Sequence, residues 1–237
     1  MKHRLKAWKY CDNKNKINYT LKHYKSEFKK FYKRFHEKYT LSRRTRVISQ
    51  EILRFLPDHA NILDIGCGGG EIAEILTDSN PTLKVSGIDI GGRTNSNIEI
   101  TTYDGITIPF ENNSFDFAII VDVLHHTAIP KLILIEALRV SKRGIIVKDH
   151  NCAGRIQKTI MKITDTLGNW HHDVPLFFNF LSRKKWLLLW NVLNLNEEYY
   201  TTRLNIYSQF RGCIFKKDMD FISVLKKRST TDYLNLD

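Results

Sequence analysis

Between residues 61 and 150, short apolar runs alternate with segments of helical spacing. The apolar runs are ILDI, LKVSGIDI, IEITTYD, FDFAIIVDV and GIIVKD, and the helical segments include EIAEIL and KLILIEALRV. Apolar runs separated by helices are typical of parallel strands that are covered on both faces. The sequence therefore predicts an α/β fold with a mostly parallel, doubly wound sheet.

The segments on either side of this region are less regular. Residues 21–39 carry aromatic and leucine side chains at steps of three and four, which predicts a helix with one apolar stripe. A second helix is expected over residues 42–55, ending near Pro57. Residues 151–197 contain the aromatic-rich block PLFFNFLSRKKWLLLW and are expected to form a helical cap insertion. The strand-like runs YYTTRLNIY and FISVLKK predict that the sheet ends with an antiparallel C-terminal strand.

The positive charge of the chain lies near its N-terminus. Residues 1–60 contain 17 of the 37 Lys and Arg residues but only 5 of the 25 Asp and Glu residues, so the remaining 20 basic and 20 acidic residues cancel. The whole net charge of +12 therefore belongs to this quarter of the chain. This division predicts a basic N-terminal helical lid, residues 1–60, in front of a neutral domain, residues 61–237.

Several classes of protein are disfavoured by what the sequence lacks. No apolar stretch is long enough to span a bilayer, and the start, MKHRLKAWKY, has no apolar secretory segment. The four cysteines form no CxxC pair and have no zinc-binding spacing with histidine. We therefore expect a cytoplasmic protein with reduced thiols and no structural metal.

The stretch ILDIGCGGG, residues 62–70, places glycines where a strand meets a helix, so that backbone N–H groups can face a ligand. The dinucleotide pattern G-x-G-x-x-G fails at its last position, because Gly66 and Gly68 are followed by Glu71, whose carboxylate would repel a pyrophosphate. The nucleotide-binding pattern G-x-x-x-x-G-K-[ST] is absent from the sequence as well. The remaining pattern, D-x-G-x-G-x-G from Asp64 to Gly70, suits a ligand that carries a positive charge.

Two further acids follow the next two expected strands. Asp89 ends GIDI, where a carboxylate can bind both hydroxyls of a ribose. Asp104 lies in TTYDG, where a carboxylate can accept a hydrogen bond from an adenine amine. A cationic amino-acid end, a ribose and an adenine together describe S-adenosylmethionine.

On these motifs, together with IPFENNSFDFAIIVDVLHH and RGIIVKDH, residues 60–150 resemble the class I S-adenosylmethionine-dependent methyltransferases, in particular the small-molecule group called type 11. The resemblance implies a Rossmann-like fold and S-adenosylmethionine as cofactor. It implies that Asp64 and the glycines hold the methionine end, that Asp89 holds the ribose, that Asp104 and Gly105 face the adenine, and that Val121 and Asp122 border the methionine. The full set of expected cofactor-binding residues is Asp64, Gly66, Cys67, Gly68, Gly70, Asp89, Ile90, Asp104, Gly105, Val121 and Asp122.

Methyl transfer to a hydroxyl or an ammonium needs a group that removes a proton. The candidates that follow expected strands are His125 and His126 after the fourth strand, and Asp149 and His150 after the fifth. His171, in the HHD run of the expected cap, could orient an acidic acceptor. Each has a plain alternative, since one histidine of an LHH segment often packs under the helix, and the HHD run could be a solvated turn.

The acceptor is predicted to be a small molecule methylated on O or N, in secondary-metabolite, sugar or cell-surface biosynthesis. Enzymes that methylate base amino groups usually carry N/D-P-P-Y/F/W after the fourth strand. In this chain the fourth expected strand is followed by DVLHH, and the next proline after it is Pro130. The alternative is an RNA methyltransferase whose basic N-terminal helices follow a phosphate backbone. A non-catalytic cofactor-binding scaffold is disfavoured, because all the expected cofactor-binding acids are present.

Overall fold

A computed structural model describes residues 42–91, 98–169, 177–206 and 219–228. The chain divides into two compact units, Met1–Arg44 and Thr45–Asp237, and the account below concerns the second. The expected helix over residues 21–39, and most of the expected N-terminal lid, lie outside the described residues.

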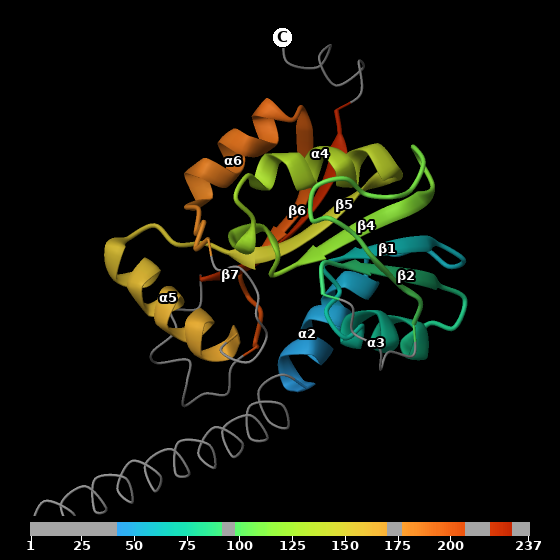
Figure 1. Ribbon diagram of the computed structural model, residues 1–237, viewed down its shortest axis with the longest axis horizontal. Coiled ribbons are helices and arrows are strands. Elements are labelled where there is room, and N and C mark those ends of the chain that lie inside the picture. The colour runs from blue at the N-terminus through green and yellow to red at the C-terminus, as the bar shows by residue number, and fades with distance from the viewer. Residues whose placement is uncertain (1–41, 92–97, 170–176, 207–218, 229–237) are drawn as a thin grey trace, which may run out of the picture. The chain divides into compact units, whose positions relative to one another are not determined.

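The second unit is built on a seven-stranded sheet (Figure 1). Its strand order is β3-β2-β1-β4-β5-β7-β6. The first five strands in sequence are parallel to one another, whereas β7 is antiparallel to both β5 and β6. The prediction of a mostly parallel sheet with an antiparallel C-terminal strand is confirmed. The strand bounds are β1 Asn61–Ile65, β2 Lys84–Asp89, β3 Ile100–Thr102, β4 Phe115–Val121, β5 Ser141–His150, β6 Leu195–Thr201 and β7 Asp220–Lys227.

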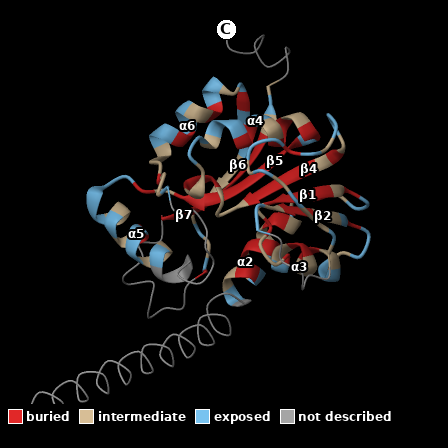
Figure 2. Cartoon of the chain, viewed as in Figure 1, coloured by how far each residue is buried: buried red, intermediate tan, exposed pale blue. Residues whose placement is uncertain are grey.

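Helices cover both faces of this sheet, as the apolar runs predicted. Helices α2 (Ser42–Leu53) and α3 (Glu71–Ser79) lie on one face, and α4 (Pro130–Val140) and α6 (Arg183–Val192) lie on the other (Figure 1). Helix α5 (Arg155–Asn169) follows β5, and the short 3-10 helix η2 (Leu124–His126) follows β4. The strands β1, β4, β5 and β7 are mostly buried (Figure 2).

Alternate side chains of each central strand enter two separate cores. Ile62 of β1 packs with Ile48 and Ile52 of α2, which are one helical turn apart and fully buried. The next residue of β1, Leu63, faces the other core, where it clusters with Trp186 of α6. The apolar stripe of α2 therefore packs against the sheet from Thr45 onward.

The residues expected to form a cap, 151–197, contribute to two different clusters. Trp186 and Trp190 of α6 stack on each other, with ring centroids 5.3 Å apart, and belong to the main core beside α4. Phe180 instead packs with Cys152, and with Met161 of α5, in a small separate cluster. This small cluster holds α5 beside the carboxyl end of β5, where the polar residues described next are found.

Candidate functional site

The glycine loop lies at the point where the strand order reverses, between β1 and β4. Such switch points at the carboxyl ends of parallel strands are the usual ligand crevices of open α/β sheets. Gly66 adopts a φ of +70°, and a Cβ added there would lie 2.4 Å from Val123 Cγ2, beyond the end of β4. Gly68 and Gly70 also have positive φ. The glycines thus allow the loop to turn tightly while it contacts the segment that follows β4.

Asp64 lies beneath this loop with little compensation for its charge. The residue is 2% exposed, and its Oδ2 atom has no hydrogen-bond partner among the described residues. Burial, followed by the negative charges of Glu71 and Asp89, raises the pKa of Asp64 from 3.8 to about 7. A buried acid that lacks a partner is suited to a cationic ligand group.

Asp89 ties the glycine loop to the loop after β2. Its Oδ2 accepts a hydrogen bond from Gly68 N at 2.8 Å, and its Oδ1 accepts one from Gly91 N at 2.8 Å. Each carboxylate oxygen can accept more than one hydrogen bond, so both can still receive a ligand hydroxyl. The side chain of the next residue, Ile90, is 48% exposed and lies close to Gly105, where an added Cβ would be 3.0 Å from Ile90 Cγ2.

Two further expected cofactor residues, Asp104 and Cys67, have surroundings that differ from those of Asp89. Asp104 is exposed, and its Oδ1 accepts hydrogen bonds from the backbone N–H groups of Ile106 and Thr107, which lower its pKa. It therefore caps its own turn, as an ordinary strand-end acid would. The buried thiol of Cys67 packs against Gly87 of β2, so the side chain of Cys67 points under the loop.

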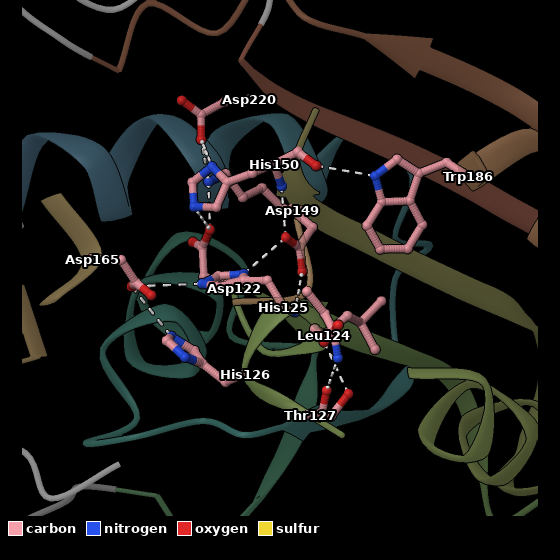
Figure 3. Close-up of polar contacts among 12 residues, drawn as sticks. Asp122, Leu124, His125, His126, Thr127, Asp149, His150, Asp165, Trp186 and Asp220 are labelled. Atoms are coloured by element: carbon pink, nitrogen blue, oxygen red, sulfur yellow. Dashed lines mark hydrogen bonds and ion pairs between the residues drawn. The ribbon is translucent and has the colours of Figure 1, made fainter. Parts of the chain in front are cut away.

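A second group of polar residues lies where β4 and β5 end (Figure 3). His125 Nδ1 lies 2.8 Å from Asp149 Oδ1, and both side chains are almost completely buried. Asp149 also accepts hydrogen bonds from the backbone N–H groups of His125 and His150. Burial lowers the pKa of His125 and the charge of Asp149 raises it, with a net rise to about 9, while the pKa of Asp149 falls to about 2.

Asp122 belongs to the same group and has a strained backbone. Its φ is +57°, an unusual value for a residue other than glycine, and such strain is common at functional sites. Its Oδ1 accepts a hydrogen bond at 2.6 Å from the buried ammonium of Lys148, which also donates to Asp220 Oδ1 at 2.5 Å. His150 lies between the two acids, with Nε2 3.3 Å from Asp122 Oδ1 and Nδ1 3.0 Å from Asp220 Oδ1.

Helix α5 contributes one more acid to this group. Asp165 Oδ1 lies 3.4 Å from His126 Nε2 and 3.7 Å from His125 Nε2. His126 has the most exposed side chain of the three histidines, at 14%, compared with 7% for His150 and 1% for His125. We call the eight residues Asp122, His125, His126, Lys148, Asp149, His150, Asp165 and Asp220 the polar cluster.

The structure thus brings four of the five expected catalytic residues together: His125, His126, Asp149 and His150. The fifth, His171, lies outside the described residues. Sequence reasoning did not identify Lys148, Asp165 or Asp220. A lysine inside the apolar run GIIVKD was a usable signal for Lys148, whereas the pattern of α5 gave no sign that Asp165 faces inward.

A shallow cavity of about 600 Å3 lies elsewhere, next to the amino ends of β4 and β5. Its lining consists of Arg54, Phe55, Leu56, Pro57, Phe117, Arg143 and Lys226. Because this is the edge of the sheet opposite to the glycine loop and the polar cluster, the cavity is separate from the candidate site.

Comparison with known families explains the glycine loop. Residues 63–147 match the model of the family described as Methyltransferase domain, of type 11. This part of the chain is a methyltransferase domain. The family and the fold together indicate an S-adenosylmethionine-dependent methyltransferase, as the glycine loop and Asp89 predicted. The residues present fit this cofactor, because Asp64 is a buried acid whose Oδ2 has no hydrogen-bond partner in the described part of the chain, and Gly66 leaves no room for a side chain.

Solved structures share the fold of the methyltransferase domain. An S-adenosylmethionine-dependent methyltransferase of Methanosarcina mazei is 20% identical, with a TM-score of 0.54 over 75% of this chain and 96% of its own. One from Aquifex aeolicus is 16% identical, with a TM-score of 0.53 over 75% and 88%. The methyltransferase in complex with the Haloferax volcanii methyltransferase activator Trm112 is 13% identical, with a TM-score of 0.56 over 83% and 93%. At these identities the likeness establishes the fold alone.

Two further searches, one for related curated sequences and one for membrane-spanning helices in the described residues, found nothing. No curated protein sequence matches this chain significantly. Among the described residues, no helix combines the length and the apolar character that crossing a membrane requires.

Proposed function

We propose that the chain transfers a methyl group from S-adenosylmethionine to an oxygen or nitrogen atom of a small polar or acidic acceptor. The observation that supports this acceptor class is the segment after β4. It forms a 3-10 turn that carries His125 and His126, held in place by a hydrogen bond from Asn179 N to His125 O at 2.9 Å. It contains neither the prolines nor the aromatic residue with which enzymes that methylate base amino groups hold a planar nitrogen.

The donor half of the site consists of the glycine loop and the loop after β2. We assign the methionine end to Asp64 and the backbone of the glycine loop, and the ribose hydroxyls to Asp89. Ile90 and Gly105 are assigned to the adenine, because an exposed isoleucine beside a glycine offers a flat apolar contact. When bound, the cofactor supplies an electrophilic methyl group on a sulfonium.

The acceptor half is assigned to the polar cluster. His126 is the proposed general base, since its partly exposed side chain can reach an acceptor that enters from the edge of the sheet. His125 and Asp149 are too deeply buried for this role and are proposed to position the turn, because Asp149 binds His125 through both its ring and its backbone. Val121 and Asp122 lie between the two halves.

The donor assignment is tested by isothermal titration calorimetry with S-adenosylmethionine. We expect binding by the wild-type protein and at least tenfold weaker binding by Asp89→Ala, with no change for Asp58→Ala, whose carboxylate is exposed and remote from the loop. Failure of the wild type to bind, or equal affinity of Asp89→Ala, would contradict the assignment.

The acceptor class is tested by methyl transfer from radiolabelled S-adenosylmethionine to fractionated cell extracts. Label is expected in the small-molecule fraction, and its appearance in the RNA fraction would overturn this part of the proposal. Filter binding over a salt series supplies an independent check, because a protein that neutralises RNA phosphates loses affinity steeply as salt rises. Tight, salt-sensitive RNA binding would favour the RNA methyltransferase instead.

A further inference from the structure

Metal-ligating atoms converge within the polar cluster. In one set, formed by Asp122, His125 and His150, the possible ligand atoms all lie within 4.8 Å of one another. A second set with the same property comprises His125, His126 and Asp165. The ligand atoms of a tetrahedral divalent ion are about 3.3–3.6 Å apart, because metal–nitrogen and metal–oxygen distances are about 2.0–2.2 Å. His150 Nε2 and Asp122 Oδ1 already have this separation, at 3.3 Å, so the first set can surround one ion if His125 moves closer to them by at most about 1.5 Å.

One unsatisfied atom of the cluster points to the same place. His125 Nε2 is buried and makes no hydrogen bond to any described residue, and it lies 3.7 Å from Asp165 Oδ1. Leaving a buried ring nitrogen without a partner is costly. In Figure 3 the side chains of Asp122, His125 and Asp165 point toward one another from three different elements. A metal ion bound to His125 Nε2, with release of the ring proton, would give this atom a partner.

The opposite nitrogens of the two buried histidines face carboxylates. His125 Nδ1 lies 2.8 Å from Asp149, and His150 Nδ1 lies 3.0 Å from Asp220. A carboxylate on the far side of an imidazole fixes the ring and its tautomer, and it is the usual second contact of a metal-binding histidine. The ring of His125 is thereby oriented with Nε2 toward Asp165. His150 Nε2 lies 3.3 Å from Asp122 Oδ1, although His150 Nδ1 makes no hydrogen bond to a described residue.

The charges of the cluster leave room for a cation. Four carboxylates lie in the cluster: the ammonium of Lys148 contacts those of Asp122 and Asp220, and those of Asp149 and Asp165 lie against the ring of His125. A cation bound among them would add to the compensation of this buried negative charge. Lys148 does not prevent Asp122 from binding an ion, because a carboxylate has about four lone-pair sites and can serve two cations at once.

We propose that the polar cluster binds one divalent first-row transition-metal ion through Asp122, His125 and His150, with Asp165 as a further ligand. Two imidazoles with carboxylate oxygens form a donor set that suits ions such as Zn2+, Fe2+ or Co2+ rather than Mg2+. If the proposed function holds, the bound ion would hold an acceptor oxygen next to His126 and favour loss of the proton from that oxygen. This consequence of the inference rests on the proposed function.

The test is calorimetric titration of untagged, chelator-treated full-length protein with Zn2+ alone. One ion is expected to bind per chain, with at least tenfold weaker binding in both His125→Gln and His150→Gln. The matched control is His59→Asn, because His59 is exposed, lies at the opposite edge of the sheet, and has a φ of +60° that asparagine tolerates. Absence of zinc binding by the wild type would overturn the proposal, as would wild-type affinity in both His125→Gln and His150→Gln. A loss of zinc affinity in the His59→Asn control alone would also overturn it.

A second measurement needs no substitution and decides the matter if a buried variant fails to fold. X-ray absorption at the zinc edge of the wild-type complex should show two imidazole ligands together with oxygen ligands. A spectrum with no imidazole contribution would overturn the proposal. Titration of the same chelator-treated protein with S-adenosylmethionine separates the two hypotheses, because intact donor binding without zinc binding refutes the metal site and leaves the proposed function standing.

Discussion

Replacing Asp64 by asparagine should stabilise the ligand-free protein while weakening its binding of S-adenosylmethionine. The folded protein holds the Asp64 proton more tightly than the unfolded chain does, since burial raises the pKa from 3.8 to about 7. Folding stability therefore falls as pH rises between these two values and levels off above the upper one. At pH 8 the wild-type protein has thereby lost about 4 kcal/mol of its free energy of unfolding. The asparagine variant cannot ionise at this position and does not lose this free energy.

The assay is urea unfolding of both proteins at pH 5, 6, 7 and 8 without cofactor. The stability of Asp64→Asn relative to wild type should increase with pH across this range, whereas Asp58→Asn, at an exposed position, should follow the wild type. Calorimetry at pH 8 should show the opposite effect on the cofactor, with at least tenfold weaker binding by Asp64→Asn. A stability difference that does not change with pH, or a less stable variant at pH 8, would refute the reasoning.

Three further substitutions examine other parts of the structure. Gly66→Ala should lower the free energy of unfolding by about 2 kcal/mol, because of its positive φ and its contact with Val123, and the double variant with Val123→Ala should recover part of this loss in urea unfolding. His126→Ala should reduce the methyl-transfer rate at least 100-fold with unchanged cofactor affinity, and equal rates would remove His126 as the base. Trp186→Ala should cost about 3–5 kcal/mol in thermal unfolding, since it empties a fully buried site and removes the hydrogen bond to His150 O, and a loss below 1 kcal/mol would contradict this packing.

The sheet was predictable from sequence because its central strands are buried on both faces. Residues 62–65 and 117–120 have almost no polar members, and runs of this kind between helices have few alternatives to a parallel sheet. The helix over residues 42–55 was also predictable, since Ile48 and Ile52 repeat at a one-turn spacing. The division of residues 151–197 between two clusters could not be foreseen, because the aromatic block has no periodicity that separates the side chains facing the sheet from those facing α5.

The donor and acceptor halves of the candidate site differed in what the sequence could predict. Asp64, the glycines and Asp89 are close together in sequence, and their spacing follows from one strand-loop-helix-strand unit. The sequence also led us to expect no metal, because short spacings between cysteines and histidines were the signal sought. The ligands proposed here come from the residue after β4, from η2, from β5 and from α5, and their separation of up to 43 positions along the chain leaves no local motif.

This difference follows from how the sheet is assembled. The donor half is built mainly on the loops after β1 and β2, which pair directly. The polar cluster depends in addition on β7 running antiparallel to β5, so that His150 and Asp220 are paired residues at the carboxyl edge of β5. An acid at the start of β7 therefore helps to hold the imidazole of His150 and the ammonium of Lys148, although 70 residues separate it from His150. Changes in β7 and α5 can consequently alter the acceptor half while the glycine loop stays intact. In this fold, the sequence after residue 150 can thus change the polar cluster, which is the proposed acceptor half, while the donor half stays the same.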